Sequence, residues 1–211
     1  MKNLVVWAAD VGSIQKRNFG WCRIPSHRNN QEGIEVSTGR DIGDFTTGVA
    51  DDLSAGKTVA LGFECPLFVP VTDDPLCLTS AREGEDNRAW SAGAGAGALV
   101  VGLTECVWIL ERIRRVARVR VVPTLDWEQC TSEKANLFLW EAFVTKTAKA
   151  ASHLGDAEVA AKTFMANYPQ IAEANAVKAE NPFCLIGAAL LRSGLAADLR
   201  LLFEQCVVIK A

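Results

Sequence analysis

The sequence LVVWAAD at residues 4–10 decides the fold, because six consecutive apolar residues end in an acidic one. An apolar run of this length predicts a buried strand, and the VGS that follows predicts a tight turn. A second run, TVALGFE at residues 58–64, also ends on an acid and is stopped by Pro66. We therefore expect strands that are covered on both faces, each with a carboxylate at its end.

Strands and helices alternate around these two runs. Further strands are predicted at residues 19–24, 33–38, 119–124 and 137–145, and helices at 45–55, 94–117, 153–166 and 182–194. The segment 137–145 is ambiguous, since a helix-capping pattern precedes it while its aromatic and β-branched residues favour a strand. The order predicts an α/β protein with a mixed five-stranded sheet flanked by helices. A core at 1–166 and a helix-rich extension at 167–211, ending in an edge strand, are expected.

Composition narrows the class of protein. The chain has 211 residues and a formal net charge of −3, which argues against broad, non-specific coating of nucleic acid. Its seven cysteines include no CxxC pair and it has two histidines, so neither a disulfide framework nor a zinc site is indicated. The apolar start is too short for a signal peptide, and Glu105 interrupts the longest apolar stretch at 98–110. We expect a cytoplasmic protein without a membrane segment.

Three acids, Asp10, Glu64 and Asp156, are the main candidate functional residues. The first two end strands, and Asp156 opens a predicted helix, where a carboxylate gains from the helix dipole. Each also has a structural interpretation, since Asp10 suits a turn and Asp156 suits helix capping. Glu64 has the weakest structural explanation, because it directly follows a buried strand. If the three converge, they can bind Mg²⁺ or Mn²⁺ for phosphodiester hydrolysis.

Three short patterns resemble the RNase H-like superfamily. They are the DVGS at residues 10–13 followed by FGW at 19–21, the FECPL at 63–67, and the HLGDA at 153–157. The match is closest to the RuvC-like resolvase branch and to the uncharacterised predicted RNase H-like nucleases, and it covers about residues 3–166. The resemblance implies an RNase H-like fold and a metal-dependent nuclease. Its substrate would be a structured nucleic acid, and its cofactor Mg²⁺ or Mn²⁺ at a two-metal site.

The same resemblance assigns roles to individual residues. Asp10, Glu64 and Asp156 would be the metal ligands. His153 lies three residues before Asp156, on the same helical face, and would orient a water or contact a phosphate. Ser13 in the first turn is a further candidate for phosphate contact.

Sites of this branch have a fourth acidic ligand. Glu141 is the expected one, because an ionised glutamate beside Trp140 and Phe143 is costly unless it is paired or metal-bound. Asp126 and Glu158 are the alternatives.

Other residues are candidates for contact with nucleic acid. Arg82 and Arg88 lie in the long loop that leaves Glu64, so they are expected at phosphates. Trp90 and Trp127 are the tryptophans outside the predicted core elements, and they could stack on bases. The alternating glycines at 91–98 suit either close helix packing or an anion site. The arginines at 112–120 suit a solvated helix face better than a phosphate site.

Two other functions remain open at this stage. The DVGS turn is also similar to the phosphate loop of the actin/hexokinase type of phosphotransferase, although 211 residues hold one such domain and that type has two. A catalytically silent interaction protein is the other alternative. Apolar segments at 185–191 and 199–203 would then serve a partner or a homodimer.

Overall fold

A computed structural model describes residues 3–26, 35–86, 89–145 and 147–211. Its centre is a mixed seven-stranded sheet in the order β3-β2-β1-β4-β7-β6, with β9 also paired to β7. The strands are β1 (Leu4–Asp10), β2 (Gly20–Pro25), β3 (Ser37–Gly39), β4 (Thr58–Phe63), β6 (Pro123–Thr124), β7 (Leu137–Phe143) and β9 (Val207–Lys210). The α/β class and the mixed sheet are confirmed, but the sheet has two strands more than expected.

The three central strands run parallel and are buried along nearly their whole length. β1 lies between β2, to which it is antiparallel, and β4, to which it is parallel. β4 is in turn parallel to β7, so residues 137–143 form the strand that their aromatic content favoured. Because the strands are parallel, their carboxyl ends meet at one edge of the sheet.

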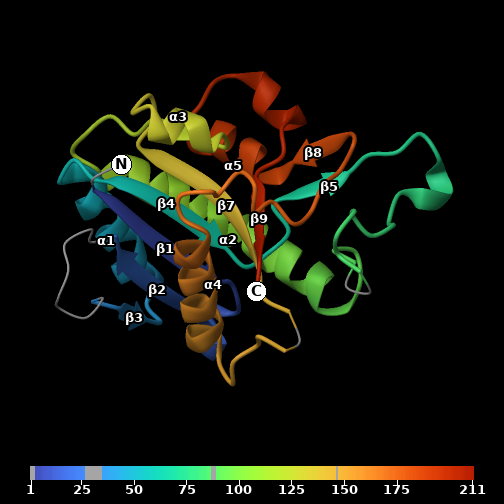
Figure 1. Cartoon of the computed structure of the whole chain (residues 1–211), viewed down its shortest axis with the longest axis horizontal. Helices are drawn as coiled ribbons and strands as arrows, with labels where there is room; N and C mark the ends of the chain where they lie inside the picture. Colours follow the sequence, from blue (N-terminus) through green and yellow to red (C-terminus); the bar gives the residue numbers. More distant parts are fainter. Residues whose placement is uncertain (1–2, 27–34, 87–88, 146) are drawn as a thin grey trace.

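Helices cover both faces of this sheet (Figure 1). The helices are α1 (Ile42–Ser54), α2 (Gly93–Val116), α3 (Trp127–Thr131), α4 (His153–Asn167) and α5 (Leu185–Ser193). Val5 and Trp7 of β1 pack in one core with α1, α2 and α5, whereas Leu4 and Val6 pack in a second core with α3 and α4. Alternate residues of a strand point to opposite faces, so each core is one face of the sheet.

Residues 167–211 are less helical than expected. They hold α5, the 3₁₀ helix η3 (Leu199–Phe203), and two strands. β8 (Pro182–Cys184) pairs with β5 (Phe68–Pro70) in a small second sheet, and β9 joins the main sheet as the predicted edge strand. β6 pairs with the first residues of β7 and β9 with the last. Together they satisfy backbone groups that β7 would otherwise leave exposed.

The third strand is shorter than expected. β3 is Ser37–Gly39, while the expected strand began at residue 33; residues 33–34 lie outside the described part of the chain. The helix expected at 45–55 begins earlier, because Asp41 accepts a hydrogen bond from the Asp44 N–H and caps α1.

Helix α2 is the one described helix whose length and apolar composition would suit a membrane span. In the structure it is a packed helix over its C-terminal half, where Cys106, Ile109 and Ile113 are buried against the sheet. Its N-terminal half is much more open, and Val100 is 68% exposed. The apolar stripe expected along this helix is therefore buried at one end only.

Candidate metal centre

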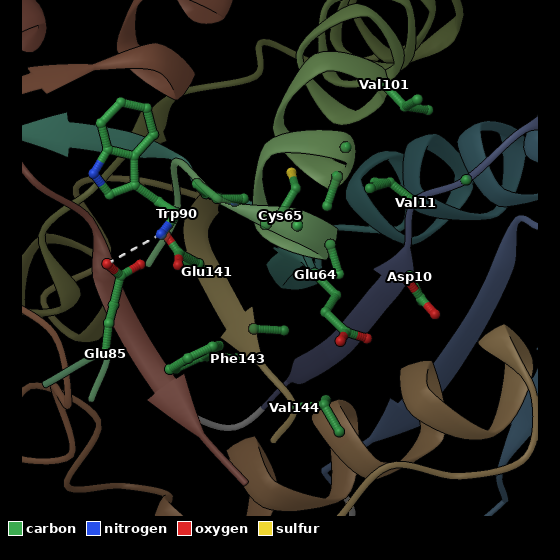
Figure 2. Close-up of a pocket in the computed structure, with 18 of the residues that line it drawn as sticks. Asp10, Val11, Glu64, Cys65, Glu85, Trp90, Val101, Glu141, Phe143 and Val144 are labelled. Carbon is green, nitrogen blue, oxygen red and sulfur yellow. Dashed lines mark hydrogen bonds between the residues drawn. The ribbon is translucent and has the colours of Figure 1, made fainter. Parts of the chain in front are cut away.

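The ends of β1 and β4 place Asp10 beside Glu64 (Figure 2). Ala9 is in register with Phe63, and the Glu64 N–H donates to the Ala9 carbonyl at 2.8 Å. Asp10 lies on the same face of β1 as Ala8, which packs on the α4 side of the sheet. Glu64 continues the face of β4 that carries Ala60, which also packs on the α4 side. Two strand ends therefore present carboxylates to the same helix.

Helix α4 brings the third carboxylate to this edge. Ser152 caps the helix by accepting a hydrogen bond from the Gly155 N–H, and Asp156 lies in the first turn. Gly20 on β2 permits the approach, since a Cβ there would lie 2.4 Å from the Leu154 nitrogen. A side chain at residue 20 would push the start of α4 away from the sheet.

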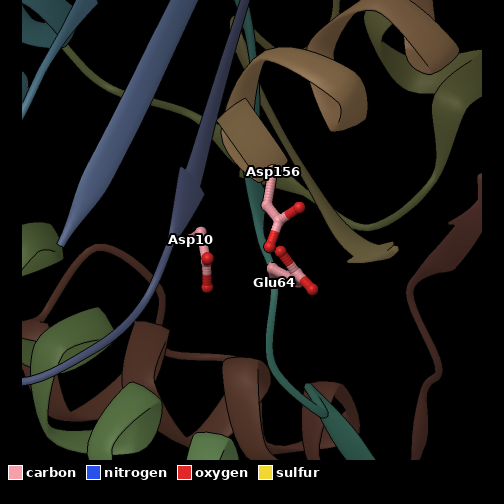
Figure 3. A group of neighbouring side chains, drawn as sticks. All are labelled: Asp10, Glu64 and Asp156. Carbon is pink, nitrogen blue, oxygen red and sulfur yellow. The ribbon is translucent and has the colours of Figure 1, made fainter. Parts of the chain in front are cut away.

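The three carboxylates form one compact acidic cluster, defined as Asp10, Glu64 and Asp156 (Figure 3). One oxygen from each lies within 4.8 Å of the others. Asp10 and Asp156 are both only 4% exposed. Burial and then the charges of Glu64 and Asp156 together raise the pKa of Asp10 to about 9, although the charge of Lys149 opposes the shift. The convergence expected from the sequence is present.

Lys149 provides a positive charge to the acidic cluster. Its Nζ lies 3.1 Å from Glu64 Oε1 and 3.1 Å from Asp156 Oδ2. Burial lowers the pKa of Lys149, but the Glu64 and Asp156 carboxylates outweigh it and the net shift is upward. Lys149 was not identified as a site residue from the sequence. The one indication was that it lies four residues before His153, close in the chain to the predicted site. One ammonium compensates only part of the charge of three carboxylates.

His153 lies against the cluster, as the HLGDA pattern implied. Its Nδ1 is 2.6 Å from Asp10 Oδ2, but the two atoms are not aligned as a hydrogen bond. Burial and then the charge of Lys149 lower the pKa of His153, which favours the neutral imidazole at pH 7. A neutral ring keeps one nitrogen available as a proton acceptor.

The donor set fits a hard divalent cation. Carboxylate oxygens are the ligands that Mg²⁺ and Mn²⁺ prefer, and Mg²⁺ needs only one or two from the protein because it keeps several waters. Asp10 Oδ2 is buried and has no hydrogen-bond partner within the described ranges. A buried acid of this kind is costly unless a cation offsets it. The acidic cluster can therefore hold Mg²⁺ or Mn²⁺.

Glu141, the expected fourth ligand, is not part of the acidic cluster. It lies on the face of β7 opposite to Trp140 and Ala142, which pack on the α4 side of the sheet. Its carboxylate instead accepts hydrogen bonds from Arg82 at 2.6 and 2.8 Å and from the Leu67 N–H. The alternatives also lie elsewhere, because Asp126 caps α3 and Glu158 pairs with Lys162.

Arg82 is not a phosphate contact in this structure. It is buried between Glu85 and Glu141, with which it forms ion pairs at 2.8 and 2.6 Å. We call these three residues the Arg82 group. Ser13 caps the 3₁₀ helix η1 (Ile14–Lys16), and Arg88 lies outside the described residues.

The tryptophans and arginines that were candidates for nucleic-acid contact lie in different environments. Trp127 is buried and donates its indole N–H to the Pro169 carbonyl, so it cannot stack on a base. Trp90 remains partly open. Arg115 and Arg118 are exposed and pair with Glu111 and Asp51 at the C-terminal end of α2. This agrees with a solvated helix face.

Glu105 is a buried acid that sequence reasoning treated only as an interruption of an apolar stretch. It is 8% exposed, and burial raises its pKa to about 7, although a hydrogen bond from the Gly12 backbone opposes the shift. Its charge also raises the pKa of Asp10. A charged residue within thirteen otherwise mostly apolar residues at 98–110 was the available signal.

A pocket of about 640 Å³ opens directly from the acidic cluster. Asp10, Glu64, Lys149 and His153 line it together with residues of the Arg82 group. Figure 2 shows Trp90 and Phe143 on the far side of the pocket from Asp10. Of the glycines at 91–98, Gly95 packs closely, since a Cβ there would lie 2.9 Å from the Ala89 carbonyl oxygen, whereas a Cβ at Gly93 or Gly97 would meet nothing within 4 Å. Most of this segment lines the pocket. The site is thus a chamber with the acidic cluster at one end and the Arg82 group at the other.

Comparisons with protein-family models, curated proteins and solved structures give no match to this chain. The geometry of the acidic cluster and of its pocket is therefore the basis for assigning a function.

Proposed function

We propose that this protein is a metal-dependent nuclease of RNase H-like fold that hydrolyses phosphodiester bonds in nucleic acid. One observation carries the proposal: three acids from β1, the end of β4 and α4 lie with their oxygens within 4.8 Å of one another. Acids that only cap helices or turns have no reason to converge in this way. Phosphodiester hydrolysis with divalent ions needs carboxylates from separate elements.

The sheet supports the RNase H-like part of the proposal. Three strands linked in antiparallel fashion, β1 to β3, precede the parallel strands β4 and β7. The acids lie at neighbouring strand ends and on the helix that packs over them, as the resemblance implies for this superfamily. Strands β6, β8 and β9 are additions to that core.

The residues of the site have separable roles. Asp10, Glu64 and Asp156 would hold the cation, which when bound stabilises the charge that develops on the phosphate and activates water. His153, favoured as neutral, is placed to accept a proton at the edge of the acidic cluster. Lys149 bridges Glu64 and Asp156 through its ammonium, so it would hold a positive charge beside a phosphate that binds at the acidic cluster.

A cleavage assay tests the function. Fluorescent DNA and RNA substrates are incubated with the purified protein and Mg²⁺ or Mn²⁺, and the Asp10→Asn/Glu64→Gln double variant is run in parallel. We expect metal-dependent cleavage by the wild type and a loss of more than roughly a hundredfold in the double variant, since even the outer partners of metal ligands are worth about ten- to a hundredfold.

Asp51→Asn, at an exposed ion pair on α1, is the matched control and keeps full activity. Cleavage that persists in the double variant would refute this site. Thermal stabilisation by ATP and Mg²⁺ without any cleavage would favour the phosphotransfer alternative instead.

A further inference from the structure

The pocket beside the acidic cluster is built for an apolar, flat group. Trp90 and Phe143 contribute aromatic surface on the side away from Asp10, and Val11, Val101 and Val144 contribute aliphatic surface. Figure 2 shows these side chains around one space that reaches Glu64. Aromatic side chains of this kind stack on nucleobases with little dependence on sequence.

The start of α2 leaves the space open. The residues of α2 that line the pocket are mostly glycine and alanine, and they include Ala94, Gly97 and Ala98. A Cβ added at Gly97 would meet nothing within 4 Å. Larger residues at these positions would reduce the space, so the small side chains define its size.

The size of the pocket excludes a double helix. A volume of about 640 Å³ lies within the roughly 300–1,000 Å³ of sites that enclose a small molecule. A base within a duplex is stacked and paired, and it enters a pocket only after it leaves the stack. An unpaired nucleotide can enter without that cost.

The charges at the two ends of the pocket determine the orientation of a bound nucleotide. The far end holds the Arg82 group, in which two carboxylates face one guanidinium whose N–H groups bond Glu85, Glu141 and the Phe68 carbonyl. This group carries a net negative charge and repels a phosphate. The phosphate therefore belongs at the acidic cluster with its cation, and the base belongs toward Trp90.

We infer that the pocket holds the unpaired base of the nucleotide beside the phosphate that is cleaved, an inference that rests on the proposed nuclease function. The substrate is then a single-stranded segment, a loop or a frayed end, and an intact duplex is a poor substrate. The chemistry is common to DNA and RNA, so both are included in the test.

Gly97→Leu tests the inference. The residue lies inside α2, where leucine is favoured over glycine by about 0.8–1 kcal/mol, so the variant is expected to fold. The new side chain would occupy the pocket without touching the acidic cluster. Thr104→Leu is the matched control, because Thr104 is exposed on the same helix and does not line the pocket.

Binding is measured by fluorescence anisotropy with labelled single strands and blunt duplexes of the same sequence, in Ca²⁺ to prevent cleavage. We expect the wild type and Thr104→Leu to bind single strands at least about tenfold more tightly than duplexes. Gly97→Leu should lose roughly ten- to a hundredfold in single-strand affinity, which is the value of stacking one base. Calorimetry with Mn²⁺ alone should give the same metal affinity for all three proteins.

The two proposals fail in distinguishable ways. Equal binding of duplex and single strand, unchanged binding by Gly97→Leu, or no binding of single strands would each overturn the base pocket while leaving metal-dependent cleavage measurable. If the wild type neither binds Mn²⁺ nor cleaves, the nuclease proposal is overturned. If Gly97→Leu in that case still binds single strands more weakly than the wild type does, the base pocket is retained.

Discussion

The acidic cluster and the Arg82 group are two buried sets of carboxylates at the same edge of the sheet, on opposite faces. In the Arg82 group, Glu85 and Glu141 share one guanidinium, and each accepts charge-assisted hydrogen bonds at 2.6–2.9 Å. In the acidic cluster, Lys149 pairs with Glu64 and Asp156, and the pKa of Asp10 stays raised to about 9. The two sets therefore differ in how the charge of their buried acids is balanced, with a guanidinium bonded to both carboxylates in one and a buried carboxyl of raised pKa in the other.

Asp52 supports this distinction at a third place. It is buried on α1, and hydrogen bonds from Arg23, Lys57 and the Trp7 indole lower its pKa even though burial opposes the shift. Full compensation again accompanies a structural role. Burial alone therefore does not distinguish Asp52 from Asp10, whereas the direction of the pKa shift does, and a strongly raised pKa is the feature on which the proposal for Asp10 relies.

The largest effect on stability is expected when the compensated group is broken. Glu141→Gln leaves the Arg82 guanidinium buried with one carboxylate fewer, and removing one partner of a buried pair costs about 3–5 kcal/mol. Urea denaturation of this variant and of Asp51→Asn, whose ion pair is exposed, measures the contrast. The control should lose no more than about 1 kcal/mol. Equal losses would show that the Arg82 group is not a special contributor to stability.

A substitution at Asp10 in the acidic cluster should change stability in the opposite direction. Asp10→Asn removes an acid whose pKa is raised from 3.8 to about 9. At about 1.36 kcal/mol per pKa unit, the metal-free protein should gain up to about 4 kcal/mol at pH 7. The same variant should lose the rise in melting temperature that Mn²⁺ produces in the wild type. A destabilised variant that still responds to Mn²⁺ would contradict both parts.

The smallest change, taken per unit of pH, is a slope of stability with pH. Because the pKa of Asp10 is higher in the folded state than in the unfolded state, the folded protein holds the extra proton between about pH 4 and pH 9. Stability of the metal-free protein should fall across this window, by at most about 1.4 kcal/mol per pH unit for one proton. Glu105, with a pKa raised to about 7, contributes in the same direction.

Saturating Mn²⁺ should flatten that slope, since the cation binds the deprotonated carboxylates. Asp10→Asn should flatten it as well, without metal. Denaturation curves at several pH values measure both, and a slope that is the same in wild type and variant would assign it to groups other than Asp10.

Much of the site was predictable from local patterns. Apolar runs ending in an acid located Asp10 and Glu64 at strand ends, and the helical pattern that begins with HLGDA located Asp156 in the first turn of a helix. These are short-range signals, because strand and helix limits depend on neighbouring residues. The parallel pairing of β1 with β4 then brings the first two acids together almost automatically.

The errors share a cause in long-range pairing. Glu141 was correctly placed on a strand and correctly described as costly unless compensated, but its partner Arg82 lies 59 residues away in the chain. Trp127 follows a loop in sequence, yet Phe138 and Phe164 enclose it in the second core. No local sequence pattern predicts either of these contacts.

The sequence by itself determined the main strands and helices of the core and the three acids of the cluster, because these depend on periodicity and on residues close in the chain. The tertiary structure alone decided which buried acids are compensated. It brought Arg82 to Glu141, placed Lys149 between Glu64 and Asp156, and opened the pocket beside the acidic cluster. Compensation of charge requires contacts between distant segments, and only the folded chain establishes them.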